Sequence, residues 1–416
     1  MPDIALAKKL QALVQQYEKS HPESKRAFER AEQVLPGGST RSVLVSDPFP
    51  LVIKSAHGAQ FTTVDGVKFD DFLSDFSAGI YGHSHPVIQE AVQQALSTGF
   101  SLGGITEKEA ELGEILAGRF PSIEKVRFCN SGTEANTFAV ATALAHTQRK
   151  KVLVFKNGYH GGTMNFSKPD NPMNIPHQFV FGTYNDIEAT RAVVNNEIGA
   201  ILVEPMQGAG GMIRGTREFL SYLRQAADEI GAILIFDEVV TSRLHYRGMQ
   251  GELGIIPDMT TLGKYIGGGF PFGAFGGSTE IMSRFDSRDK SVTLHHSGTF
   301  NNNIFTMSAA VAASRLITES QLRRLNAMGD RLREEATEIL RKAKFDEMSF
   351  TGYGSAVGIH FSGDDAEALR EYFYFGLINR GISIGRRGFV SLNLAHTEES
   401  VDRLLEALKA FVDDLS

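Results

Sequence analysis

Short strand-like segments alternate with helical patterns through the middle of this chain, and that alternation restricts the fold more than any other feature. The segments cover residues 126–128, 151–155, 200–203 and 232–236, and an amphipathic stretch at 217–230 separates the last two. The last three segments are almost continuously apolar, which is typical of strands buried on both faces of a parallel sheet. We therefore predict an α/β fold in which helices cover a central parallel sheet.

Polar residues follow these segments directly. Asn130, Ser131 and Gly132 come after the first segment, Glu204 after the third and Asp237 after the fourth. Ligands of parallel sheets gather at the carboxyl ends of the strands. The shared placement predicts a binding site at that edge of the sheet.

The composition fits a globular protein with a large core. The chain has 416 residues, of which 42% are hydrophobic and 22% charged. Its net charge of −7 argues against a nucleic-acid or anionic-membrane surface, and no apolar run is long enough to span a bilayer. The single cysteine, Cys129, cannot pair within the chain, and the first residues lack the apolar core of a signal peptide, so we expect a cytoplasmic protein.

The two ends of the chain differ from the middle and predict a smaller α+β domain. Helical patterns, short strands and a hairpin turn at 64–66 occupy the N-terminal part, and a long helical region covers 304–343. Strands and helices alternate again in the tail, at 355–361, 364–379, 388–394 and 397–413. The expected boundaries are 1–65 for the N-terminal part of the small domain, 66–315 for the large domain and 316–416 for the rest of the small domain.

Lys264 and Asp237 together predict the chemistry of the site. Lys264 lies in a glycine-rich segment, where the backbone can approach a ligand closely, and Asp237 ends an apolar strand. An aldehyde cofactor needs an amine to form a Schiff base, and a pyridine ring that takes up electrons needs a carboxylate at its nitrogen. The pair therefore indicates pyridoxal 5′-phosphate (PLP). The alternative for Lys264 is an ordinary surface lysine, and the alternative for Asp237 is a structural salt bridge or a helix cap.

A phosphate would bind where Ser131, Gly132 and Thr133 lead from a strand into a helix. Free backbone N–H groups and the helix dipole attract an anion there. The alternative is a capping box, because Ser131 and Glu134 have its spacing, and the two interpretations are compatible.

Other candidates surround this core of the site. Tyr159 could stack on the cofactor ring or face solvent, and Val239 could press on the ring or pack in the core. Glu204 and Gln207 could place polar groups near the ring, and Thr299 could hold an anion. The neighbouring histidines at 295 and 296 lack the thiols or carboxylates of a metal site, so no metal is expected.

Two arginines could bind a substrate carboxylate through two parallel hydrogen bonds. These are Arg41, which follows a Pro-Gly-Gly break, and Arg387 in the C-terminal part. The alternative for each is a solvated surface charge.

The ordered set of these motifs resembles the class III PLP-dependent aminotransferases of fold type I. The motifs are Ser131-Gly132-Thr133-Glu134-Ala135-Asn136, Tyr159-His160-Gly161, Glu204-Pro205, Asp237-Glu238-Val239, Thr261-Leu262-Gly263-Lys264 and Gly298-Thr299-Phe300. The resemblance extends from about Phe28 to the end of the chain. It implies a large PLP domain with a mainly parallel sheet and a small domain built from both chain ends.

The resemblance also implies roles for single residues. Lys264 corresponds to the Schiff-base lysine that shuttles the proton, and Asp237 to the partner of the pyridine nitrogen. Ser131, Gly132 and Thr133 correspond to the phosphate cup, and Tyr159 and Val239 to the walls around the ring, with His160 also in the cofactor site. Thr299 corresponds to a phosphate contact from the neighbouring subunit, which implies a homodimer with shared active sites.

Within the class, the substrate depends on which branch the chain resembles. Phe28-Glu29-Arg30-Ala31 and Gly267-Gly268-Gly269 resemble glutamate-1-semialdehyde aminomutase. Glu204-Pro205-Met206-Gln207-Gly208, Gly298-Thr299-Phe300-Asn301-Asn302-Asn303 and Arg387-Gly388-Phe389 are more similar to the β-phenylalanine aminotransferases. That branch implies that Arg41 binds the β-carboxylate, that Arg387 binds the α-carboxylate of the keto acid, and that Phe76 and Tyr81 shape the side-chain pocket.

The expected activity is therefore transfer of an amino group from a β-amino acid to a 2-keto acid. The alternatives are an aminomutase, an ω-amine transaminase and a PLP-free protein that has kept the fold. A dehydrogenase is disfavoured, because no G-x-G-x-x-G motif follows an N-terminal strand.

Overall fold

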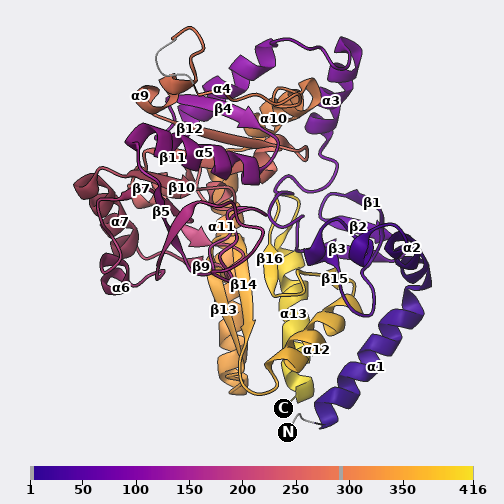
Figure 1. Ribbon diagram of the computed structural model, residues 1–416. Coiled ribbons are helices and arrows are strands. Elements are labelled where there is room, and N and C mark those ends of the chain that lie inside the picture. The colour runs from indigo at the N-terminus through magenta and orange to yellow at the C-terminus, as the bar shows by residue number, and fades with distance from the viewer. Residues whose placement is uncertain (1–3, 290–293, 416) are drawn as a thin grey trace. The chain divides into compact units, whose positions relative to one another are not determined.

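A computed structural model describes residues 4–289 and 294–415 of the chain. The chain forms two compact units (Figure 1). Unit 1 comprises Met1–His85 and Leu325–Ser416, and unit 2 comprises Pro86–Arg324. The functional domain boundaries predicted at 65/66 and 315/316 remain predictions.

Unit 2 is built around a seven-stranded sheet. In spatial order its strands are β4 (Lys125–Cys129), β12 (Gly273–Gly277), β11 (Met259–Gly263), β10 (Ile233–Asp237), β7 (Ile198–Val203), β5 (Lys151–Phe155) and β6 (Gln178–Gly182). β12 is antiparallel to both neighbours, and the other adjacent pairs are parallel. The predicted α/β class and mainly parallel sheet are therefore confirmed.

Three strands of this sheet, β6, β11 and β12, were not predicted. β12 has three glycines, which are depleted in strands, so its sequence lacks the usual signal. The structure explains two of them by close approach. A Cβ at Gly273 would lie 2.1 Å from the carbonyl oxygen of Ser131, and one at Gly276 would lie 2.7 Å from that of Lys125.

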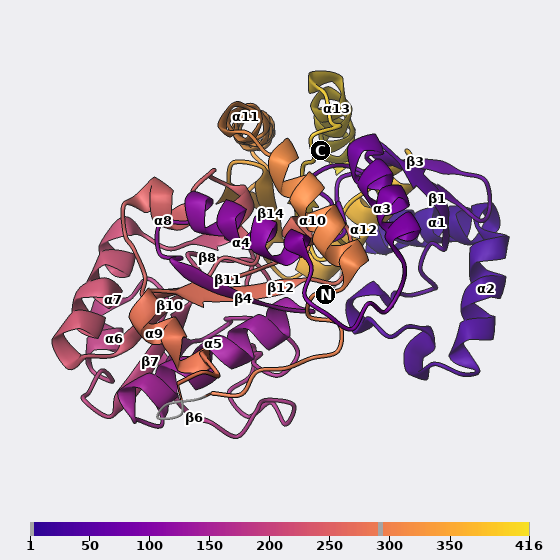
Figure 2. The same ribbon diagram turned by 90° about the horizontal axis from the view of Figure 1, so that it is seen from above.

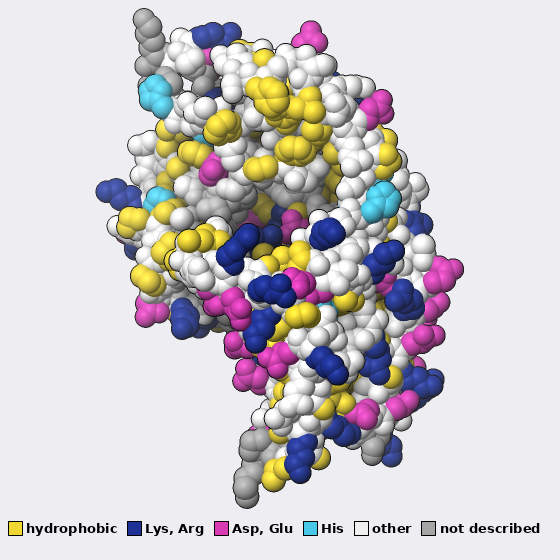
Figure 3. Space-filling model, turned by 90° about the vertical axis from the view of Figure 1, so that its right-hand side faces the viewer, with side chains coloured by type: hydrophobic (Ala, Val, Ile, Leu, Met, Phe, Trp, Pro, Cys, Tyr) yellow, Lys and Arg dark blue, Asp and Glu magenta, His cyan; other side chains and the backbone are white. Residues whose placement is uncertain are grey.

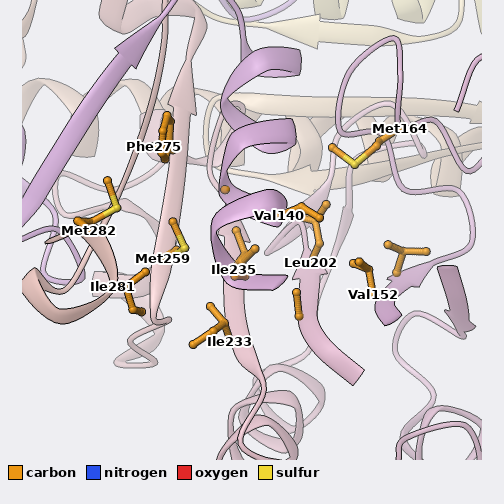
Figure 4. Close-up of a cluster of buried hydrophobic side chains, with 14 of the residues drawn as sticks. Val140, Val152, Met164, Leu202, Ile233, Ile235, Met259, Phe275, Ile281 and Met282 are labelled. Atoms are coloured by element: carbon orange, nitrogen blue, oxygen red, sulfur yellow. The ribbon is translucent and has the colours of Figure 1, made fainter. Parts of the chain in front are cut away.

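Helices cover both faces of the sheet. α4 (Glu107–Arg119) and α10 (Ile304–Leu316) lie together on one side, and α5 (Gly132–Thr147) lies on the other (Figure 2). Under α5, Val140 packs with Ile235, Leu202, Met259 and Val152 of the strands (Figure 4). The remaining helices and strands of unit 2 are α3 (Pro86–Thr98), α6 (Ile187–Arg191), β8 (Met206–Gln207), β9 (Ile213–Arg214), α7 (Arg217–Ile230), α8 (Gly248–Leu253) and α9 (Thr279–Met282).

Unit 1 contains two small sheets and, within the described residues, five α-helices, of which α11 begins in unit 2. One sheet has the order β1 (Ile53–His57), β2 (Gln60–Thr63), β3 (Lys68–Asp71), β15 (Ile382–Ser383), and the other the order β13 (Met348–Tyr353), β14 (Ala356–Phe361), β16 (Phe389–Ser391). The helices are α1 (Ile4–Ser20), α2 (Pro22–Glu32), α11 (Glu319–Ala343), α12 (Ala366–Ile378) and α13 (Glu398–Leu415). One core cluster is mostly aromatic and joins both chain ends, with Tyr17, Phe49 and Phe375 in contact.

The long helical region predicted at 304–343 is present, with a break at residues 317 and 318. The structure has two helices there, α10 and α11, because Ile317 takes an extended backbone conformation after α10. Thr318 then accepts a hydrogen bond at its Oγ1 from the N–H of Gln321 at 3.2 Å, as an N-cap residue does. None of the helices in the described ranges has the length and apolarity to cross a membrane.

Candidate active site

The strands of unit 2 bring Asp237 and Lys264 to the same edge of the sheet. Asp237 is the last residue of β10 and pairs with Thr261 of the parallel neighbour β11. Lys264 directly follows the last residue of β11. The two residues on which the sequence prediction rests therefore leave adjacent parallel strands at their carboxyl ends, where ligands of such sheets bind.

Asp237 is a buried carboxylate held by several donors. Its Oδ2 accepts hydrogen bonds from Asn136 Nδ2 and from His160 Nδ1, both at 2.8 Å, and its Oδ1 accepts one from the N–H of Val239 at 3.0 Å. The Thr261 hydroxyl lies 2.7 Å from Asn136 Oδ1 but 3.4 Å from Asp237 Oδ1, so its single hydrogen serves Asn136. Oδ1 thus keeps room for one more donor, such as a pyridinium N–H.

Asn136 is a residue whose role the sequence did not reveal. It lies inside α5 with an exposed fraction of 1% and joins Asp237 to Thr261 and to the carbonyl of His160. A buried asparagine within a helix is unfavourable unless its amide is satisfied elsewhere, which is the signal that could have identified it.

Three predicted motifs meet beside Asp237 at two glycines. A Cβ at Gly132 would lie 3.1 Å from Val239 Cγ1, and a Cβ at Gly263 would lie 3.3 Å from the same atom and 3.6 Å from Gly132 Cα. Only residues without side chains fit this approach comfortably. The phosphate-cup segment, Val239 and the backbone that leads into Lys264 are therefore immediate neighbours.

The N-terminus of α5 is both capped and open to an anion. Ser131 Oγ accepts a hydrogen bond from the N–H of Glu134 at 3.1 Å, and Glu134 Oε2 accepts one from the N–H of Asn130 at 2.8 Å. The first bond is the one expected of the capping alternative, whereas in the second Glu134 reaches the residue before the N-cap instead of Ser131 itself. Because the first N–H groups of a helix have no partner within it, those of Gly132 and Thr133 suit a phosphate. Both interpretations of this motif can therefore hold together.

Lys264 begins a packed turn rather than a loop. Its φ is +52°, which a residue other than glycine rarely adopts, and the next residue, Tyr265, is fully buried. The Tyr265 hydroxyl donates to the carbonyl of Ser242 at 2.9 Å and accepts from Arg119 Nη2 at 2.8 Å. The glycines around Lys264 predicted a turn, and the structure has one, in which the buried side chain of Tyr265 fixes the backbone after the lysine.

Glu204 and Gln207 occupy the strand end next to β10. Glu204 accepts hydrogen bonds from the N–H of Tyr159 at Oε1 and from that of Gly208 at Oε2, both at 2.9 Å. Burial raises the pKa of Glu204 to about 7, with the charge of Asp237 adding to the effect and His160 opposing it. Gln207 donates its amide to the carbonyl of Lys156 at 2.8 Å, and Tyr159 is 44% exposed.

In unit 1, Arg41 lies between a carboxylate and an aromatic ring. Its Nη1 is 2.7 Å from Asp75 Oδ1, and its guanidinium carbon lies 5.4 Å from the ring centre of Phe76. The ring of Phe76 contacts that of Phe389 at 5.7 Å, and Phe389 lies two residues after Arg387. The structure thus connects the segments of both predicted substrate arginines.

The neighbouring arginines 386 and 387 differ in their environments. Arg386 donates to Glu371 Oε2 at 2.8 Å and to the carbonyl of Asp47 at 2.7 Å, so its charge is used inside the unit. Arg387 is exposed in the turn before β16 and forms no ion pair with the described residues. Tyr81 is 4% exposed and meets the ring of His85 edge-on.

The segment that carries Thr299 is anchored on both sides. Arg127 Nε donates to His296 Nδ1 at 2.9 Å, and Asn130 Nδ2 donates to Asn301 Oδ1 at 2.9 Å. Burial, and then the charge of Arg127, lowers the pKa of His296, which favours the neutral ring that accepts this bond. Thr299 itself is exposed between these anchors.

Comparison with known proteins identifies the family. Residues 43–412 match the family described as aminotransferase class-III. The chain belongs to the class III aminotransferases. A β-phenylalanine transaminase from Variovorax paradoxus is 43% identical over 97% of this chain and 96% of its own length. A glutamate-1-semialdehyde 2,1-aminomutase from Methanopyrus kandleri is 34% identical, over 96% of this chain and 99% of its own.

Solved structures confirm the fold of this class III aminotransferase. That of a β-phenylalanine aminotransferase from Variovorax paradoxus superposes with a TM-score of 0.95 and 41% identity, over 98% of each chain. A transaminase with PLP bound has a TM-score of 0.89 and 32% identity, over 95% of this chain and 98% of its own. The resemblance predicted from the motifs is confirmed, and PLP is the cofactor of this enzyme.

The residues of unit 2 fit PLP. Asp237 Oδ1 can accept the ring N–H, the amides of Gly132 and Thr133 can hold the phosphate, and Lys264 offers an amine at the same sheet edge. When bound, PLP supplies an aldehyde that takes up a substrate amine and a ring that accepts the electron pair of a broken bond. The hydrogen bonds from Asn136, His160 and the N–H of Val239 fix the orientation of the Asp237 carboxyl group, so that it can accept the N–H of the ring nitrogen.

Proposed function

We propose that this enzyme transfers the amino group of a β-amino acid to a 2-keto acid. An aromatic donor such as β-phenylalanine is the first candidate. The observation that carries the proposal is the setting of Arg41, whose guanidinium pairs with a solvated carboxylate and lies over the ring of Phe76. A ligand with a carboxylate and an aromatic side chain can use the same two interactions. The 43% identity to a β-phenylalanine transaminase supports the same substrate class.

Within this proposal, Lys264 Nζ binds the cofactor's aldehyde between reactions and moves the proton at the amine-bearing carbon of the donor. Asp237 keeps the ring nitrogen protonated. Tyr159, Val239, His160, Glu204 and Gln207 line the cofactor, and Thr299 contacts the phosphate of a second copy. Arg41 binds the donor's carboxylate, Arg387 that of the keto acid, and Phe76 and Tyr81 shape the side-chain pocket.

We also propose a homodimer with shared active sites. Thr299 and Phe300 are exposed beside anchored residues, and Phe300 is 62% exposed. Phe100 and Ile105, in the segment after α3, are 66% and 91% exposed. Hydrophobic side chains gather on this part of unit 2 (Figure 3). A second copy would cover such a surface, because monomers rarely expose large apolar patches.

For the compartment we propose the cytoplasm. A chain with a single cysteine cannot form an internal disulfide, which suits a reducing compartment.

The experiment that tests the substrate class is a donor screen on the PLP-loaded enzyme. β-Amino acids, α-amino acids and simple amines are each supplied with 2-oxoglutarate or pyruvate, and the keto product is measured. Arg41→Ala should raise KM for β-amino acids about tenfold or more, because a charged hydrogen bond is lost, and should change KM for simple amines far less. Lys264→Ala is the inactive control. Equal effects on both donor types would remove Arg41 from the carboxylate site.

A 2,1-aminomutase is the second candidate, because the aminomutase from Methanopyrus kandleri matches almost the whole chain. The same screen separates the two activities. An aminomutase would convert its substrate without consuming a keto acid, whereas a transaminase would form equal amounts of keto product and new amino acid. Turnover of simple amines alone would instead indicate an ω-amine transaminase.

A further inference from the structure

Asp75 carries the carboxylate that pairs with Arg41 in the described chain. A single oxygen of Asp75 meets a single nitrogen of Arg41, at 2.7 Å, so most of the donors of the guanidinium are not used by this pair. The side chains are 56% and 48% exposed, respectively. An ion pair so open to water contributes little to stability, and another carboxylate can replace it.

The backbone around Asp75 is held in an uncommon conformation. Four successive residues, Ser74, Asp75, Phe76 and Ser77, have φ of +46°, +45°, +52° and +75°. For residues other than glycine this left-handed conformation is unfavourable, at a cost of about 1 kcal/mol or more per residue. A run of four such residues needs support from its surroundings.

Part of that support comes from buried polar groups at the start of the turn. Asp71 Oδ1 accepts hydrogen bonds from the N–H groups of Leu73 and Ser74, at 2.9 and 3.1 Å. Asn393 Nδ2 donates to Ser74 Oγ at 2.9 Å in a buried contact. The turn thereby presents Asp75 and Phe76 to the same guanidinium, one as a counter-ion and the other as a ring beneath it.

We propose that Asp75 is a specificity-determining residue whose carboxylate occupies Arg41 until a substrate carboxylate takes its place. The inference rests on the proposed binding of a donor carboxylate by Arg41. Asp75 balances the charge of Arg41 in the free enzyme and competes with incoming carboxylates. Phe76 stays in place during the exchange, because its ring also contacts that of Phe389.

The test measures binding rather than turnover. The probe is 3-phenylpropanoate, which has the ring and carboxylate of the proposed donor but no amine, and its neutral counterpart is 3-phenylpropan-1-ol. Calorimetric titration of the PLP-loaded enzyme gives both dissociation constants. Asp75→Asn should bind the carboxylate about two- to fivefold more tightly, the range expected when a competing exposed ion pair is removed. Its affinity for the alcohol should change less than twofold.

Two controls keep this test sharp. Asparagine tolerates left-handed φ values well, so Asp75→Asn preserves the turn. The control variant Asp364→Asn removes the same charge from an exposed position elsewhere in unit 1 and should leave carboxylate binding unchanged. In an Arg41→Ala background, Asp75→Asn should no longer tighten carboxylate binding.

The outcomes separate this inference from the proposed function. Weaker or unchanged carboxylate binding by Asp75→Asn, while Arg41→Ala still weakens it, would overturn the competition and leave the role of Arg41 intact. Unchanged binding by Arg41→Ala would overturn both. An Arg41-dependent gain in Asp75→Asn would support the inference even if the donor screen found another class of carboxylate-bearing donor.

Discussion

At the scale of single residues, two neighbouring strand ends hold their carboxylates in opposite ways. Asp237 accepts hydrogen bonds from two side chains and a backbone N–H, which fix the orientation of its carboxyl group. Glu204 accepts only two backbone N–H groups, and burial raises its pKa to about 7. The difference suits their positions, because the partner of a ring nitrogen must be held in a fixed orientation, whereas Glu204 can gain or lose a proton near neutral pH.

The raised pKa of Glu204 makes stability depend on pH. Because its pKa is about 7 in the folded chain and 4.5 without burial, the folded state holds this proton more tightly between those values. The contribution of Glu204 to the free energy of unfolding is therefore largest below pH 4.5 and falls as the pH rises toward 7. Glutamine cannot titrate, so cofactor-free wild-type protein should lose stability relative to Glu204→Gln between pH 5 and pH 8.

Urea unfolding of both proteins across this range would measure the effect. Glu218→Gln, which changes an exposed glutamate of the same unit, is the control and should follow the wild type in parallel. A constant difference between wild type and Glu204→Gln at all pH values would show that Glu204 does not titrate in this window.

The sequence predicted the reactive pair but not the residues that position it. Lys264 was recognisable by the glycines around it and Asp237 by its place after a predicted strand, and a Schiff-base cofactor needs both an amine and a carboxylate. Asn136 and Asp75 were not recognised, since their importance depends on contacts between segments far apart in the chain. Asn136 reaches Asp237 from α5, and Asp75 reaches Arg41 from the left-handed turn at 74–77.

At the scale of elements, glycines decide how closely the loops approach α5. The predicted strands 151–155, 200–203 and 232–236 are all present, because continuous apolar runs give a clear signal. β12 was missed, because its glycines serve close packing rather than strand propensity. The same close packing recurs in the segment after β5, where Gly161 lies against Thr133.

Gly161 and Gly162 form a matched pair for testing this packing. Gly161 has a φ of +108°, and a Cβ there would lie 2.2 Å from Thr133 Oγ1 and 2.6 Å from its Cα. A Cβ at Gly162 would have nothing within 4 Å. Gly161→Ala should therefore destabilise the protein by about 2–4 kcal/mol and weaken PLP binding, because the segment must move away from the start of α5.

Thermal unfolding and titration of the cofactor-free enzyme with PLP would measure both effects. Gly162→Ala should stay close to wild type, because it keeps the N–H that donates to Thr133 Oγ1 at 3.2 Å. Equal losses in both variants would mean that any added methyl group disturbs this segment and that close approach at Gly161 is not the cause.

At the scale of the whole molecule, the sequence identified the family but could not show what covers the surface of unit 2. Motifs spread over most of the chain predicted a class III aminotransferase, and the family match to residues 43–412 confirms it. Thr299 is exposed next to exposed apolar residues. The hydrophobic periodicity of the sequence does not reveal such an arrangement on the surface. The proposed second copy would explain why an anchored segment presents outward the side chain that we propose to bind phosphate.

Two substitutions separate assembly from cofactor binding. Ile105→Asp places a charge at a side chain that is 91% exposed, so it should leave folding intact but weaken a dimer that buries this side chain. Light scattering at micromolar concentration should then show a lower mass, and PLP titration a lower affinity.

Thr299→Ala should keep the dimer mass and weaken PLP binding about tenfold or more, because one hydrogen bond to a charged phosphate is lost. Ile256→Asp, at a 42% exposed position, is the control and should change neither mass nor affinity. The shared site would be contradicted if the wild-type protein were monomeric and if Thr299→Ala bound PLP as tightly as the wild type does.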